Sequence, residues 1–274
     1  MPGVILAFLA EPEAADAVLS SAERLAAQCT ASRINGLGVR LPPIETIMPT
    51  EEVLTHEQEV RMREREQKRA EALRAAFRQW AATRPDRETI AEWFDVEANA
   101  AAALKEYGAR SDVIVLTRPC DRSSEPERQA VRAALFDAER PVLLVPPGTA
   151  PAPFGRRIAI AWRDDPRTIK AVLAALRILD AAEHIDVIGG LRDGDPEPRL
   201  PEIFEEHGKP AVLHTLPLPG TEAFGAALLA KARALKADML VMGAFAHNRL
   251  HNMILGGVTK HVLAHADLPV LMRH

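Results

Sequence analysis

Residues 237–272 have the sequence ADMLVMGAFAHNRLHNMILGGVTKHVLAHADLPVLM, which combines a strand, a loop and a helix start. The apolar run from Met239 to Met242 predicts a buried parallel strand. Gly243 follows this run, and the pair Gly256–Gly257 precedes a segment with helical spacing that begins at Val258. Glycines let the backbone approach an anion, and the N–H groups of a helix's first turn can face it. This order of elements is therefore typical of a phosphate cradle.

The same stretch resembles the C-terminal signature of the universal stress proteins, whose nucleotide-binding members carry G-x2-G-x9-G-[ST] at this place. Gly243 matches the first glycine, and Gly256 matches the third with the expected spacing. Ala246 replaces the second glycine, while Gly257 stands where Ser or Thr is expected and Thr259 follows two residues later. The resemblance implies a universal stress protein, with ATP or another adenine nucleotide as the ligand of this loop.

Strands and helices alternate along the chain, and their pattern restarts after residues 146–156, PPGTAPAPFGR, which predict a linker. SDVIVLTRP in the first half aligns with ADMLVMGAF in the second, and AERPVLLV aligns with ADLPVLM. We therefore expect an α/β protein with two tandem doubly wound parallel-sheet domains, at residues 1–147 and 155–274. The resemblance implies the strand order 3-2-1-4-5 of the adenine-nucleotide alpha-hydrolase-like folds in each domain. It also implies a ligand at the switch point between strands 1 and 4.

The first domain contains a charged insertion, residues 51–83, that predicts one long helix stabilised by acid–base pairs at i,i+4 spacing. In its second half, Leu73, Phe77 and Trp80 form an apolar stripe that we expect to dock on the body of the domain. Its first half has few apolar residues, so we expect residues 51–67 to project into solvent and to contribute little to stability.

In ATP-binding members of the family, an Asp just after strand 1 holds the adenosine end of the ligand. In the second domain Arg163 aligns with that position, and Asp164 and Asp165 follow and could serve after a one-residue shift. The candidate nucleotide-binding residues are therefore Arg163, Asp164, Val187, Gly243, Ala246, His247, Gly256, Gly257, Val258 and Thr259.

The first domain lacks these features. After its fourth strand the sequence is LTRPCDRSSEPERQAV, with no glycine at the counterpart of Gly243 and no glycine pair before the next helix. Pro119 also removes a backbone donor from this turn. We therefore expect this degenerate domain to have lost the phosphate site and to serve as a structural partner.

The composition is that of a globular protein, with 47% hydrophobic and 26% charged residues. A formal net charge of −4 points to neither nucleic acid nor an anionic membrane as a partner. No apolar stretch approaches the roughly 20 residues that a membrane helix needs, so we expect a cytoplasmic protein. Cys29 and Cys120 lack metal-ligand spacing and are expected to be free thiols. No metal is clearly implied.

Three functions remain open at this point. The first is a stress-response regulatory protein that binds an adenine nucleotide in its second domain. The second is a weak ATP hydrolase, although no general base, metal-binding acid pair or activated nucleophile stands out and no catalytic residue is named. The third is a nucleotide-free scaffold that binds a protein partner.

The edges of the two expected sheets also call for partners, because edge strands carry unpaired N–H and C=O groups. Residues 141–145 and 269–272 are short apolar runs that form the last strand of each domain. We expect these two strands to pair, so that the chain forms an intrachain pseudo-dimer. A homodimer is a further possibility.

Overall fold

The computed structural model describes residues 3–42, 55–84, 88–120, 123, 125–148, 153–192, 194, 196, 199–218, 221–244 and 257–274. Their contacts divide the chain into two compact units. Among these residues, no helix combines the length and the apolar character that crossing a membrane requires.

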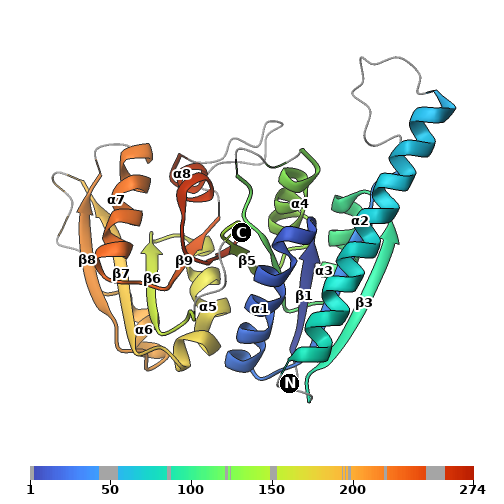
Figure 1. Ribbon diagram of the computed structural model, residues 1–274. Helices are drawn as coiled ribbons and strands as arrows, with labels where there is room; N and C mark the ends of the chain where they lie inside the picture. Colours follow the sequence, from blue (N-terminus) through green and yellow to red (C-terminus); the bar gives the residue numbers. More distant parts are fainter. Residues whose placement is uncertain are drawn as a thin grey trace. The chain divides into compact units, whose positions relative to one another are not determined.

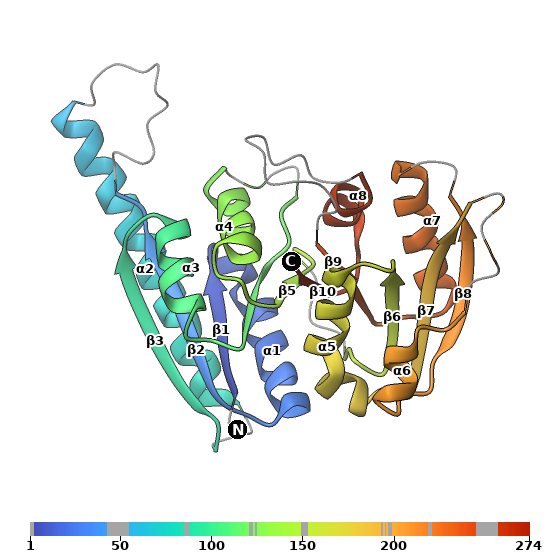
Figure 2. The same cartoon turned by 180° about the vertical axis from the view of Figure 1, so that it is seen from behind.

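The first unit is a parallel sheet covered by helices on both faces, as the sequence predicts. Its strands, in the order β3-β2-β1-β4, are β1 (Gly3–Leu9), β2 (Ala31–Arg40), β3 (Ile90–Glu97) and β4 (Val113–Thr117). Its helices are α1 (Pro12–Cys29), α2 (His56–Thr83), α3 (Ala100–Gly108) and α4 (Glu125–Phe136). The pairs α1–α2 and α3–α4 each pack together, on opposite faces of the sheet (Figure 1, Figure 2).

The second half of α2 docks on the sheet through its apolar stripe, which confirms that prediction. Leu73, Phe77 and Trp80 are all buried. The ring of Phe77 lies 5.4 Å from the rings of both Trp80 and Trp93, measured between centroids. Gly36 of β2 makes room for this cluster, because a Cβ atom there would lie 2.6 Å from the Phe77 ring. The aromatic packing therefore depends on a glycine in the strand beneath it.

The start of α2 is built from polar contacts. Thr55 and Gln58 form a capping box, in which each side chain accepts a hydrogen bond from the backbone N–H of the other. One turn on, Arg61 pairs with Glu57 at 2.6 Å, as the spacing predicts. Residues 51–54, which the expected helix includes, lie outside the described residues.

The second unit contains the other parallel sheet and one antiparallel strand. Its strands, in the order β8-β7-β6-β9-β10-β5, are β5 (Val142–Val145), β6 (Arg157–Trp162), β7 (His184–Leu191), β8 (Val212–Pro217), β9 (Met239–Gly243) and β10 (Val270–Arg273). Its helices are α5 (Pro166–Asp180), α6 (Glu202–Glu206), α7 (Thr221–Ala234) and α8 (Gly257–His265). The order of β6 to β10 is the expected 3-2-1-4-5.

β5 is the last strand of the first half of the sequence, yet its contacts group it with the second unit. It runs antiparallel to β10, with Val142 opposite Met272 and Leu144 opposite Val270. The pairing that we expect between the last strands is thus present. β5, whose four residues are all buried, supplies hydrogen-bond partners for the N–H and C=O groups along the edge of β10.

Equivalent aspartates tie the first strand of each unit to its fourth. In the first unit, Asp112 accepts a hydrogen bond from the backbone N–H of Val4 at 2.8 Å. In the second unit, Asp238 accepts hydrogen bonds from the backbone N–H groups of Gly155, Arg156 and Arg157 at 2.8 to 3.1 Å. These aspartates are the residues that align SDVIVL with ADMLVM in the sequence. The two residues that align in the sequence therefore make equivalent hydrogen bonds in the two units.

Replacing Asp238 by alanine should destabilise the second unit by about 2 kcal/mol, because three backbone donors lose a charged acceptor. The measurement is urea-induced unfolding. Asp267→Ala is the matched control, since Asp267 makes one exposed ion pair with Arg233 and should contribute less than about 1 kcal/mol. Equal effects of the two substitutions would contradict this role of Asp238.

Candidate functional site

The candidate site lies at the carboxyl ends of β6 and β9 in the second unit. These strands are parallel neighbours, with Ala161 opposite Met242, so Trp162 and Gly243 end them side by side. The chain continues from β6 toward β7 and from β9 toward β10, in opposite directions along the sheet. This is a topological switch point, where ligands of open α/β sheets bind. Trp162 packs beside it, its ring 5.9 Å from that of Phe204.

Gly243 is the last residue of β9, one residue beyond the apolar run that predicts this strand. A Cβ atom at Gly243 would lie 2.9 Å from the backbone nitrogen of Thr168 and 3.0 Å from the carbonyl carbon of Arg167. The first turn of α5 therefore crosses the end of β9 at a distance that only glycine allows. This close approach places the beginning of α5 directly at the switch point.

Of the residues that follow β6, Asp165 has a structural role, whereas Arg163 and Asp164 are exposed to solvent. Asp165 is the N-cap of α5, and its Oδ1 accepts hydrogen bonds from the N–H groups of Arg167 and Thr168, both at 2.9 Å. Arg163 is exposed and lies 3.7 Å from the same carboxylate, between Nε and Oδ2. Asp164 is exposed as well. Of the two acids that could serve a ligand after a one-residue shift, Asp165 is thus committed to the helix.

Replacing Asp165 by alanine should lower the free energy of unfolding by about 1 kcal/mol, the usual contribution of an N-cap side chain. Thermal or urea-induced unfolding would measure this loss. Asp164→Ala is the adjacent control and should leave the stability unchanged, since Asp164 is exposed. A larger loss for Asp164→Ala than for Asp165→Ala would show that the cap is assigned to the wrong residue.

α8 begins at Gly257, so the first residue of the helix is one of the predicted glycines. Because β9 and β10 are parallel, the helix between them starts at the carboxyl ends of the strands. Val258 is half-buried and Thr259 is buried. Val187 is fully buried within β7, paired in register with Ile160 rather than at the strand end.

Arg163, Asp164, Gly243 and Gly257 therefore share one edge of the second sheet, as the sequence analysis expects. The remaining candidates, Ala246, His247 and Gly256, lie outside the described residues.

Sequence reasoning missed Arg118, which is buried in the second unit. Its guanidinium donates hydrogen bonds to the carbonyl oxygens of Leu263, in the last turn of α8, and of Pro119. A cation at this end of a helix stabilises the partial negative charge of the last carbonyl groups. Nothing in the spacing of the sequence indicates the contact, because Arg118 and Leu263 are far apart along the chain.

The histidines of α8 form a pair at i,i+4 spacing. The rings of His261 and His265 lie 4.5 Å apart between centroids. A Cβ atom at Gly225 would lie 2.8 Å from the Cβ of His261, so α7 and α8 are in close contact. In the part of the chain that the structure describes, no three His, Cys, Asp or Glu side chains gather into a group that could hold a metal ion.

Residues 223–274, which include β9, α8 and β10, match the model of the universal stress protein family. A universal stress protein from Archaeoglobus fulgidus DSM 4304 is 16% identical, with 99% of this chain and 96% of that chain covered and a TM-score of 0.67. A functionally unknown protein from Pseudomonas aeruginosa PAO1 is 15% identical, with 99% and 92% covered and a TM-score of 0.59. No curated protein matches this chain. At these identities the structural likeness shows a shared fold.

Proposed function

Because residues 223–274 belong to the universal stress protein family and the chain has the fold of a protein of that family, we propose that its second unit binds an adenine nucleotide. The ligand is ATP or a close relative, and the protein acts as a stress-response regulator in the cytoplasm. The nucleotide would bind at the carboxyl ends of β6 and β9.

The observation that carries the proposal is the start of α8 at the switch point. α8 begins at Gly257, at the carboxyl ends of β9 and β10, with N–H groups that have no partner within the helix. The amino end of a helix carries a partial positive charge, so these donors suit a phosphate group. The α5 start is unsuitable for this purpose, because Asp165 already occupies its donors.

The other end of the ligand would lie beyond β6. Asp164 is exposed there and offers a carboxylate for sugar hydroxyls. The side chain of Arg163 is 67% exposed, and its 3.7 Å contact with Asp165 can be exchanged for a contact with an anionic group. Asp164 therefore takes the nucleoside and Arg163 adds positive charge near the phosphates.

Calorimetric titration of the purified protein with ATP and with AMP tests the proposal. The wild-type protein should bind with one site per chain, and Gly257→Val should abolish binding because a branched side chain crowds the helix start. Gly208→Ala is the control: Gly208 has a positive φ of 61° in a turn away from this edge, so its substitution strains the backbone without touching the site. The proposal fails if wild type binds neither nucleotide.

A nucleotide-free scaffold is the second candidate, and the departures of Ala246 and Arg163 from the family pattern favour it. Ala246→Gly should strengthen ATP binding by up to about tenfold if this position has a positive φ. Arg163→Asp should favour nucleosides over free phosphate. If the wild type and both of these variants, alone and together, bind no ATP, the scaffold explains the chain better. Phosphate release in the same samples would show whether bound ATP is hydrolysed.

A further inference from the structure

Helix α8 carries two histidines whose rings are in contact across one turn. His261 and His265 are four residues apart, so their side chains leave the helix on the same face. The centroids of the two rings lie 4.5 Å apart, with 49° between the ring planes. The i,i+4 spacing alone also suits two separate surface histidines, so the contact between the rings is what the structure adds.

The distance between the rings is that of two imidazoles bound to one metal ion. A ring nitrogen binds Zn²⁺ at about 2.0–2.1 Å, which places the ring centroid about 3.2 Å from the ion. Two such ligands at about 90–110° from each other have centroids about 4.5–5.2 Å apart. The rings of His261 and His265 are at the lower end of this range. Rotation about χ2, which has broad minima in histidine, turns the ring nitrogens while the centroids stay close to their positions.

The neighbouring helix α7 restrains one of the two histidines. α7 and α8 pack side by side, and a Cβ atom at Gly225 of α7 would lie only 2.8 Å from the Cβ of His261 (Figure 1, Figure 2). His261 is half-buried there, whereas His265, the last residue of α8, is exposed. The pair therefore combines one restrained ligand with one that solvent reaches, so an ion can enter without a movement of the backbone.

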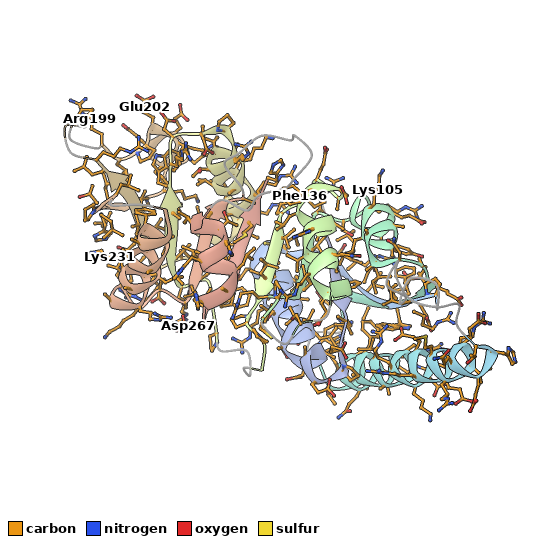
Figure 3. The ribbon with its side chains drawn as sticks, turned by 90° about the horizontal axis from the view of Figure 1, so that it is seen from above. Lys105, Phe136, Arg199, Glu202, Lys231 and Asp267 are labelled. Atoms are coloured by element: carbon orange, nitrogen blue, oxygen red, sulfur yellow. The ribbon has the colours of Figure 1, made fainter. Side chains whose placement is uncertain are left out.

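The carboxylate that follows the pair in the sequence is already engaged. Asp267 lies just beyond the end of α8 (Figure 3) and pairs with Arg233 of α7 at 2.8 Å. Among the described residues no third His, Cys, Asp or Glu joins the two histidines. Water would therefore complete the coordination of the ion. Imidazole ligands suit Zn²⁺, Ni²⁺ and Cu²⁺, whereas Mg²⁺ prefers oxygen ligands.

We propose that His261 and His265 form a two-ligand site for a divalent transition-metal ion such as Zn²⁺, Ni²⁺ or Cu²⁺. The ion links successive turns of α8 near its carboxyl end and leaves the amino end of the helix, at Gly257, open. The site contains none of the residues assigned to the nucleotide and needs no phosphate, so it is independent of nucleotide binding.

Calorimetric titration of the untagged protein with Ni²⁺ tests the proposal. The background is His247→Ala/His251→Ala, because that pair has the same i,i+4 spacing and lies outside the described residues. Two linked ligands bind far more tightly than one, so His265→Ala should weaken Ni²⁺ binding in this background by about 100-fold, and His261→Ala should do the same. Removing both should weaken binding little further, because the two ligands share one ion. His207→Ala, at another exposed histidine, is the control and should leave the affinity unchanged.

Mg²⁺ should bind none of these variants at this site. The proposal is overturned if the background protein binds no Ni²⁺, if His265→Ala keeps the full affinity, or if the losses are small and additive, as for two separate surface residues. Because His265 is exposed, its substitution should leave the fold intact, and equal melting temperatures without metal would verify this. ATP is absent throughout, so the result is distinct from that of the nucleotide titration.

Discussion

Replacement of Phe77 by alanine is expected to destabilise the first unit by about 3–5 kcal/mol, the usual cost of removing a buried aromatic ring. Phe77 is 4% exposed and lies between Trp80 and Trp93 over the bare backbone of Gly36. Because that glycine has no side chain to fill the space, the cavity left by alanine cannot close from the strand below.

Unfolding in urea, followed by tryptophan fluorescence, would measure this loss. Trp80 and Trp93 are in the first unit and Trp162 is in the second, so a Trp162→Phe background makes the signal report on the first unit. Arg78→Ala, an exposed position next to Phe77 on α2, is the control and should change the stability by less than about 0.5 kcal/mol. A loss below about 1 kcal/mol for Phe77→Ala would mean that α2 is not anchored by this cluster.

Replacement of Gly243 by alanine is expected to destabilise the second unit by about 1–3 kcal/mol and to weaken nucleotide binding at least tenfold. The added methyl group would meet the backbone of Arg167 and Thr168, which cannot rotate away as a flexible side chain can. The start of α5 must then move away from the end of β9, and the edge on which the proposed ligand rests changes shape.

Gly189→Ala provides a matched control in the same sheet. Gly189 lies in β7, where an added Cβ atom would meet nothing within 4 Å, so its substitution should be close to neutral. Calorimetric unfolding gives the stability of each variant, and titration with ATP gives its affinity. If the two variants behave alike, the close approach between α5 and β9 is not a determinant of the site.

Much of the fold follows from apolar runs and their spacing. Met239 to Met242 is a continuous apolar run, which a strand buried on both faces requires, and it forms β9 as predicted. The alignment of the two halves through Asp112 and Asp238 predicts two similar sheets. The family resemblance implies the strand order 3-2-1-4-5, and β6 to β10 have this order in the structure.

Two polar contacts were not predicted. Asp164 and Asp165 are chemically identical neighbours, but Asp165 directly precedes Pro166 at the start of α5 and is the residue that caps the helix. The sequence likewise predicts that residues 51–67 project into solvent, but Glu66 contacts the backbone of Leu41 and the side chain of Arg69. Long charged side chains hide such contacts from any analysis of apolar periodicity, because their charged ends bind backbone groups that the sequence does not place.

The pairing of β5 with β10 has a practical consequence for work on the isolated C-terminal half. A fragment that starts at residue 155 would lack β5 and leave unpaired those N–H and C=O groups of β10 that face β5, in a strand of the sequence VLMR. Such an open, apolar edge recruits strands from other molecules. A fragment that starts at Pro141 keeps the pairing of β5 with β10 and should therefore unfold at a higher temperature than the shorter one.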